Sequence, residues 1–358
     1  MKSVSRRTVT LLAGVTAAAV AVAIVASGAT ARSTQTGRVC VLLPDTVTSS
    51  RWEQFDKPAF INAFKKAKVP ATVVNALGSQ QKQLAQAESC INAGAKVGII
   101  TSLDTGTSIA IQKKFTAVGG KTIDYDRQIV GGTGSVYVAF DGTSVGAQQA
   151  LGIIGAMKRK GTYKPSSVVA QLWGGPTDAN AFWFKSGNDK ILNPLFRTKK
   201  LTKGPAKFVP GWLADKAQVL FEQMLVQTNN NVQGVIAAND SIAGAVIATL
   251  KAKGLGPIPL SGQDNTAAGV QQILAGWQTM TVYKYVPDEA NAAAAAAIAL
   301  YKGKKPPING TRPNGNKKQL AYVIPVISIT KANYTRLFRD GVLKRSEVCT
   351  GEYKKYCK

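Results

Sequence analysis

Histidine does not occur once in this 358-residue sequence. Its absence excludes the Ser-His-Asp and Cys-His relays of hydrolases, and any zinc or haem site that needs an imidazole ligand. A catalytic site would have to be built from carboxylates, lysine, tyrosine or cysteine. The sequence therefore favours a protein that is not an enzyme and that holds no metal or cofactor.

Acidic residues are scarce as well. Only 19 Asp and Glu stand against 45 Lys and Arg, which gives a formal net charge of +26. Hydrophobic residues make up 45% and charged residues 18%, as in a folded globular protein rather than a disordered basic tail. A chain of this length is expected to form two ordinary domains or one large one. The positive charge raises three hypotheses: a nucleic-acid partner, attraction to an anionic envelope, or a solvated surface.

The first 31 residues have the composition of an export signal. Lys2, Arg6 and Arg7 precede an uncharged stretch over residues 8–31, which ends in the small residues ATA. We therefore predict a signal peptide at residues 1–31 and an exported bacterial protein, periplasmic or at the cell surface. An uncleaved membrane anchor is the alternative, and SRR at 5–7 permits twin-arginine export. Cleavage removes three basic residues, so the charge of +26 falls to +23.

The four cysteines, Cys40, Cys90, Cys349 and Cys357, fit an oxidising compartment. None belongs to a C-x-x-C pair, which disfavours a metal site or a thioredoxin-like motif. Four cysteines allow three connectivities. Among these we predict Cys40–Cys90 and Cys349–Cys357, the second pair bracketing a short polar tail.

Short apolar runs alternate with longer amphipathic stretches from about residue 37 onward. The runs are rich in Val and Ile and are bounded by Gly, Pro or polar residues, as buried parallel strands are. They lie at 39–43, 71–76, 97–100, 121–125, 136–140, 167–172, 206–209, 234–238, 259–262, 280–283 and 322–327. Helices are expected between them, including 80–93, 241–253, 289–300 and one that begins near Pro58.

This alternation predicts an α/β fold of parallel sheets with helices on both faces. The strands are too many for one comfortable open sheet, so two sheets in two lobes are expected. The segment 304–318 contains one Pro-Pro and two Asn-Gly pairs and is predicted to be a long loop.

Long polar and aromatic side chains follow the predicted strands. Ligands of such folds bind beyond the carboxyl ends of the strands, so these residues are expected to share one site. The candidates are Arg51, Trp52, Asp126, Arg127, Asp178, Asn180, Trp212, Asn239, Asp240, Asp264 and Lys284. Each also has an ordinary interpretation, since Asn239 or Asp240 could cap a helix and the tryptophans could be core residues. As a set, carboxylates, amides, cations and flat rings suit a small polyhydroxylated ligand.

Several of these stretches resemble a known family. They are RW at 51–52, IDYDR at 123–127, YVAFD at 137–141, GPTDANA at 175–181, GW at 211–212, ANDSIAG at 238–244, SGQD at 261–264 and GWQTMTVYK at 276–284. In this order they resemble the periplasmic sugar-binding proteins of ABC importers, of the type I ribose/xylose kind, from about residue 37 to 347. Departures from the family pattern are Ala179, Gly142, the Cys-bracketed tail and the high charge.

The resemblance implies two Rossmann-like lobes joined by three crossings near Phe140, Asp264 and Tyr322, which close around a sugar. The lobes would comprise residues 37–140 plus 265–322 and residues 141–264 plus 323–347, followed by a tail at 348–358. It also implies that the candidates named above contact a monosaccharide, D-xylose first among similar aldoses. An ABC permease is the implied partner, a chemoreceptor is a further one, and the protein is expected to be a monomer.

Two rival hypotheses come from other classes. A nucleic-acid- or anionic-polymer-binding protein would use the basic surface, yet an export signal stands where related repressors carry a helix-turn-helix. A glycosidase could use the paired carboxylates Asp124 and Asp126, but the neighbouring cations favour permanent ligand pairing. A phosphate-binding loop at GGKT, 119–122, lacks its first glycine because Phe115 occupies that place.

Overall fold

The computed structural model describes residues 38–47, 49 and 51–357. The predicted signal peptide therefore lies outside the described residues. Residues 36–358 belong to one compact unit, and within the described part no helix combines the length and apolar character needed to cross a membrane.

Seven strands form the first sheet, in the order β10-β11-β5-β4-β3-β1-β2. All neighbours are parallel except the β10–β11 pair. The strands are β1 (Arg38–Leu43), β2 (Ala71–Asn75), β3 (Ala95–Ile100), β4 (Lys121–Tyr125), β5 (Val136–Phe140), β10 (Gly310–Asn314) and β11 (Lys317–Ile324). The central strands are buried on both faces, which explains their continuous apolar sequences.

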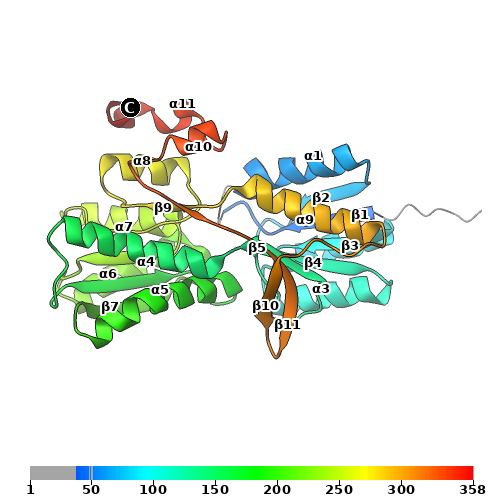
Figure 1. The fold of residues 1–358 in the computed structure, drawn as a ribbon, viewed down its shortest axis with the longest axis horizontal. Coiled ribbons are helices and arrows are strands. Elements are labelled where there is room, and N and C mark those ends of the chain that lie inside the picture. The colour runs from blue at the N-terminus through cyan, green and yellow to red at the C-terminus, as the bar shows by residue number, and fades with distance from the viewer. Residues whose placement is uncertain (1–37, 48, 50, 358) are drawn as a thin grey trace, which may run out of the picture. The chain divides into compact units, whose positions relative to one another are not determined.

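Helices cover both faces of this sheet (Figure 1). One face packs on α1 (Lys57–Ala67) and α9 (Val286–Tyr301), and the other on α2 (Gln80–Asn92) and α3 (Thr105–Ala117). A short π-helical turn, η1 (Trp52–Asp56), precedes α1. Pro58 lies in the first turn of α1, as predicted.

A second, three-stranded parallel sheet has the order β7-β6-β8, from β6 (Val168–Trp173), β7 (Thr202–Phe208) and β8 (Gly234–Ala237). It is covered by α4 (Gly142–Arg159) and α5 (Ala179–Arg197) on one face. On the other lie α6 (Ala214–Gln227) and α7 (Asp240–Ala252). The 3-10 turn η2 (Pro210–Trp212) connects β7 to α6. The predicted α/β class with two mostly parallel sheets is confirmed.

The chain continues beside this second sheet beyond residue 264. The bridges Val235↔Leu260 and Gln263↔Val282 extend the sheet toward β9 (Thr281–Tyr283), which pairs with β12 (Ile327–Ile329). Helix α8 (Ala267–Ala275) packs on α7. The lobe boundary predicted at Asp264 therefore differs from the packing, because the apolar side chains of Met280 and Val282 fill the core of the second sheet. The chain returns to the first sheet only at α9.

The C-terminal segment adds α10 (Arg336–Arg339), α11 (Arg345–Val348) and η3 (Gly351–Tyr356), which pack around α8. Figure 1 shows this segment in red beside α8. The other predicted lobe and tail boundaries stay predictions.

The segment 304–318 is not the loop that its Pro and Asn-Gly pairs predict. It contains β10 and the start of β11, which form a hairpin whose two-residue turn includes Gly315 in the left-handed region, with φ of 58°. Pro313 is accommodated because β10 is an edge strand.

Both predicted disulfides are confirmed, Cys40–Cys90 and Cys349–Cys357. The first joins β1 to α2 beneath the first sheet and closes a loop with a sequence separation of 50. By loop-closure entropy, a link of this span stabilises the fold by about 4 kcal/mol.

Candidate functional site

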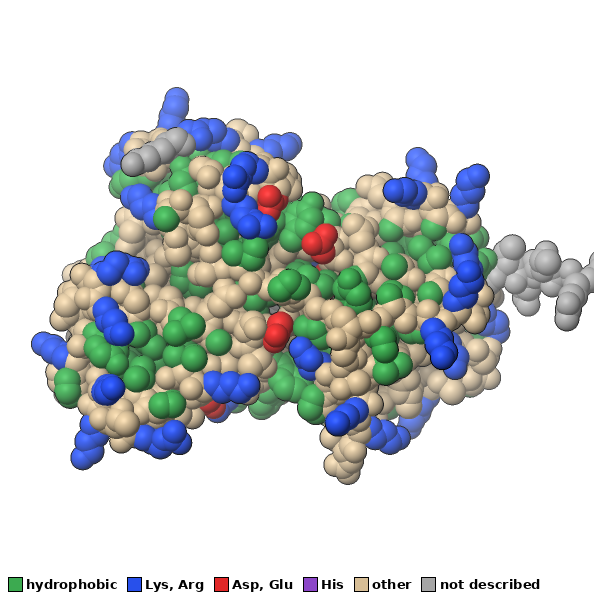
Figure 2. Space-filling view, in the orientation of Figure 1, with side chains coloured by type: hydrophobic (Ala, Val, Ile, Leu, Met, Phe, Trp, Pro, Cys, Tyr) green, Lys and Arg blue, Asp and Glu red, His purple; other side chains and the backbone are tan. Residues whose placement is uncertain are grey.

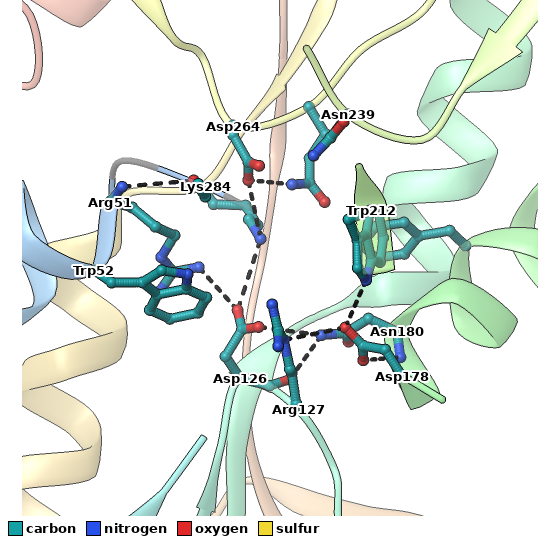
Figure 3. A pocket seen from close by; sticks show the side chains of 13 residues that line it. Arg51, Trp52, Asp126, Arg127, Asp178, Asn180, Trp212, Asn239, Asp264 and Lys284 are labelled. Atoms are coloured by element: carbon teal, nitrogen blue, oxygen red, sulfur yellow. Dashed lines mark hydrogen bonds and ion pairs between the residues drawn. The ribbon is translucent and has the colours of Figure 1, made fainter. Parts of the chain in front are cut away.

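The ends of the parallel strands converge on one cavity between the two sheets (Figure 3). Ten of the eleven predicted residues line it. They are Arg51 and Trp52 beyond β1, Asp126 and Arg127 after β4, Asp178 and Asn180 at the start of α5, Trp212 on η2, Asn239 after β8, Asp264, and Lys284 after β9. The cavity has a volume of about 30 Å³, roughly the space of one water molecule.

The charged side chains pair with one another across this space. Arg51 Nη1 lies 2.8 Å from Asp126 Oδ2, and Arg127 Nε lies 3.2 Å from Asp178 Oδ2. Lys284 Nζ is 3.3 Å from Asp264 Oδ1 and 3.7 Å from Asp126 Oδ2. The lining thus carries three cations and three carboxylates, and the cavity is close to neutral.

Asp126 is at the centre of these contacts. Besides its two cations, it accepts hydrogen bonds from Asn180 Nδ2, at 2.8 Å to the backbone oxygen and 3.2 Å to Oδ1. Burial alone would raise the pKa of Asp126, but Lys284, Arg51 and Arg127 together lower it. The carboxylate therefore stays ionised and can act only as an acceptor.

The aromatic rings form the apolar part of the lining. Trp52 lies beneath the Arg51 and Arg127 guanidinium groups, at 4.4 Å and 5.5 Å from the ring centroid. Trp212 Nε1 donates to Asp178 Oδ2 at 3.1 Å, so its indole is fixed in orientation. Phe184 packs edge-on to Trp212, with ring centroids 6.0 Å apart.

Three residues of the lining have left-handed backbones. Asp126, Trp212 and Asp264 have φ of 57°, 60° and 92°. Such conformations are unfavourable for residues other than glycine and persist where the surrounding structure imposes them, commonly at ligand sites. They aim three of the lining side chains in directions that an ordinary strand end would not give.

Asn239 has both roles that its sequence position suggests. It lines the cavity, and its Oδ1 accepts from Ile242 N at 2.9 Å as the N-cap of α7. Asp240 does not line the cavity, contrary to the prediction. Its carboxylate is held on the far side of the helix start, 2.8 Å from Gln278 Nε2 and 2.9 Å from Thr266 N.

Two groups of residues at this site are not among the predicted ones. Ser49, Phe184 and Gln263 also line the cavity. Phe184 lies one helical turn after Asn180, a spacing that could have identified it. Behind Arg51 lie Asp56, whose Oδ1 is 2.8 Å from Nη2, and Glu289, which accepts from the same nitrogen. No local pattern marks them.

The cluster behind Arg51 is rich in acid. Asp56, Glu289 and Asp126 share one fully buried guanidinium, and Tyr125 donates its hydroxyl to Asp56. Burial raises the pKa of Glu289 to about 8, because the attraction of Arg51 does not offset desolvation and the nearby Asp126.

Raising the pH from 5 to 8 is expected to lower the unfolding free energy. Burial raises the pKa of Glu289 to about 8 and those of Asp124 and Asp240 to about 7. In this window the folded chain holds protons that the unfolded chain, with ordinary carboxyl pKa values, has lost, so stability falls by up to ~1.4 kcal/mol per pH unit for each group. Asp126 has a lowered pKa and changes stability only below about pH 4.

Urea unfolding at several pH values measures this slope. Glu289→Gln keeps the shape and removes one of the titrating groups, so its stability should decline less steeply than that of the unsubstituted protein. An equal slope in both proteins would contradict the role given to Glu289.

Most of the basic residues that give the chain its positive charge do not line this cavity. Figure 2 shows Lys and Arg scattered over the visible face, with few acidic side chains among them. They do not gather into one stripe on that face, as a nucleic-acid groove requires.

Comparisons with known proteins agree with this geometry. Residues 40–305 match the periplasmic binding protein domain. The D-xylose-binding periplasmic protein of Escherichia coli (strain K12) is 32% identical over 306 residues, which cover 85% of this chain and 90% of that protein. Its namesake from Haemophilus influenzae is 34% identical over 299 residues, 83% of this chain and 88% of that protein. An ABC transporter solute binding protein from Clostridium phytofermentans, solved with bound β-D-glucose, has a TM-score of 0.80 at 25% identity and covers 87% of this chain and 99% of its own.

Proposed function

This chain belongs to the periplasmic binding protein family, and we propose that it binds D-xylose in the cavity between its two sheets and delivers it to an ABC permease. Its relatives are binding proteins without catalytic activity, in keeping with the absence of histidine. The predicted export would place it in the periplasm or at the cell surface.

The main support for this proposal is that the cavity is close to neutral. In a protein with a formal charge of +26, the cavity is lined by as many carboxylates as cations. An anionic ligand would gain little from such a lining, whereas a neutral polyhydroxylated ligand can use both kinds of charge. Sugar hydroxyls donate to Asp126, Asp178 and Asp264 and accept from the cations, and these charge-assisted hydrogen bonds are the strong ones.

Binding would exchange contacts within the protein for contacts with the sugar. The Arg127–Asp178 and Lys284–Asp264 pairs lie at the cavity, and we expect an entering sugar ring to take over contacts that these side chains make with each other. We propose that the two sheets with their helices act as lobes that hinge where the chain crosses between them, near Phe140, Lys284 and Ile324. The indole faces of Trp52 and Trp212 would then cover the apolar C–H patches of the ring.

D-xylose is the sugar that the relatives and the lining together favour. The two relatives at 32% and 34% identity are named for D-xylose binding. D-xylose lacks the exocyclic hydroxymethyl group of D-glucose, and we expect the rings of Trp52, Phe184 and Trp212, which line the cavity, to restrict the room for such a group. D-glucose, which the Clostridium phytofermentans protein holds, is the sharpest competitor to test.

Calorimetric titration with D-xylose, D-glucose, D-ribose and L-arabinose tests the proposal. We expect micromolar or tighter binding of D-xylose and at least about tenfold weaker binding of D-glucose, a difference of about 1.4 kcal/mol. Tighter binding of D-glucose than of D-xylose would change the proposed ligand but leave its class, a monosaccharide, unchanged. Absence of binding to every aldose, or binding to DNA that persists at physiological salt, would overturn the proposal.

A further inference from the structure

A second and larger cavity lies beside the first. Its volume is about 610 Å³, within the range of small-molecule binding sites. Arg51 and Asp264 line both cavities. Ser49 lines both cavities as well, so a ligand longer than one sugar ring would have to pass these three residues to extend from the first cavity into the second.

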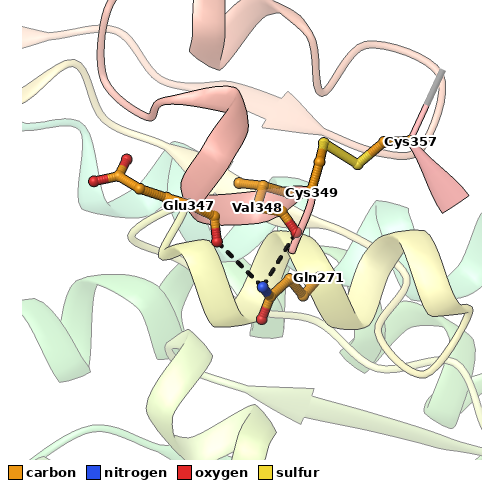
Figure 4. The surroundings of a disulfide bond; sticks show 5 residues. All are labelled: Gln271, Glu347, Val348, Cys349 and Cys357. Carbon is orange, nitrogen blue, oxygen red and sulfur yellow. Dashed lines mark hydrogen bonds between the residues drawn. A yellow bond between two sulfur atoms is a disulfide. The ribbon is translucent and has the colours of Figure 1, made fainter. Parts of the chain in front are cut away.

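The outer wall of this cavity is the C-terminal segment from Gly341 to Glu347. Gln271 on α8 anchors it by donating to the backbone oxygens of Glu347 and Val348, at 3.2 Å and 3.1 Å (Figure 4). The Cys349–Cys357 disulfide follows directly and closes the tail against the same helix. Tyr283 adds a hydrogen bond of 3.0 Å to Asp340. The tail contributes no residue to the lining of the first cavity but forms and holds a wall of the second one.

The lining combines apolar and polar groups in the manner of a sugar site. Phe55, Val342 and Leu343 offer apolar surface, while Asn265 and Thr266 offer polar atoms. Asn265 is only 4% exposed, and its side-chain oxygen accepts no hydrogen bond from any residue that the structure describes. A buried acceptor without a donor is unfavourable, and a ligand hydroxyl would satisfy it.

We propose that this cavity is a second sugar subsite, so that the chain binds a pentose disaccharide with one unit in each cavity. The proposal rests on the proposed function of the first cavity. A disaccharide fits the observations because its second ring would also be neutral, with C–H patches for Phe55 and hydroxyls for Asn265.

Titration with xylobiose, the β-1,4-linked disaccharide of xylose, tests this subsite. Ala268 is exposed at the start of α8 and lines only the second of the two cavities. Ala268→Trp should fill that cavity and weaken xylobiose binding at least about tenfold, while D-xylose affinity stays within about twofold. Ala252→Trp, at the exposed end of α7 and outside both cavities, is the matched control.

A second variant removes the unpartnered amide. Asn265 has φ of 45°, a conformation that glycine also adopts freely, so Asn265→Gly deletes the side chain without backbone strain. It should weaken xylobiose binding more than D-xylose binding. If D-xylose binds and xylobiose does not, or if both tryptophan variants affect xylobiose equally, the subsite is refuted and the proposed function stands. If neither sugar binds, the proposed function itself fails.

Discussion

Asp126→Asn is expected to weaken D-xylose binding at least about a hundredfold, a loss of about 3 kcal/mol. The Asp126 carboxylate faces Arg51 at 2.8 Å, Lys284 at 3.7 Å and the Asn180 amide at 3.2 Å, all of them donors. A neutral amide would turn two hydrogens of its own toward these donors and remove one carboxylate partner from each of two buried cations. It would also offer the sugar a weaker acceptor. Calorimetric titration at pH 7 measures the loss.

The substitution should leave the fold intact. Asn tolerates the left-handed backbone that Asp126 adopts, with φ of 57°, better than other residues of its size. Asp215→Asn on α6, whose side chain is 67% exposed, is the control and should bind like the unsubstituted protein. A D126N protein that folds and binds D-xylose within threefold of normal would remove Asp126, and with it the cavity, from sugar binding.

The fold could be predicted from sequence wherever burial produces a strong local pattern. The apolar run at 121–125 coincides with β4, and the helix expected over 80–93 is α2 to within one residue. The hairpin of β10 and β11 was not predicted, because its outer strand is polar, contains Pro313 and lies at the edge of the sheet. Its pairing depends on contacts with β5, which no local pattern reveals.

The candidate site was predictable to the extent that it follows strand ends. Topology brings such residues together, which is why Arg51 and Lys284 were identified together although they are far apart in sequence. Glu289 was not predicted to belong to the site, because its sequence context is that of an ordinary residue in an alanine-rich helix. Its role comes only from Arg51, which is 238 residues away in the chain.

Arg51→Met is expected to lower the unfolding free energy by about 3–5 kcal/mol at pH 7. Arg51 is 4% exposed and is the shared counter-ion of Asp56, Asp126 and Glu289. Methionine keeps much of the apolar stem but removes the guanidinium, which lies over Trp52. The acidic groups must then stay charged without that cation or, like Glu289 with its raised pKa, hold a proton at pH 7. The loss should be smaller at pH 5, because holding a proton on Glu289 or Asp56 in place of the guanidinium costs less as the pH approaches the ordinary carboxyl pKa.

Urea unfolding of matched variants separates this effect from lost packing. Arg197→Met, at the exposed end of α5, removes a guanidinium from the surface and should change stability by less than about 0.5 kcal/mol. Adding Glu289→Gln to Arg51→Met should restore part of the stability, since glutamine needs neither a counter-ion nor a proton taken up at pH 7. A double variant less stable than Arg51→Met alone would show that Glu289 stabilises the fold by other contacts.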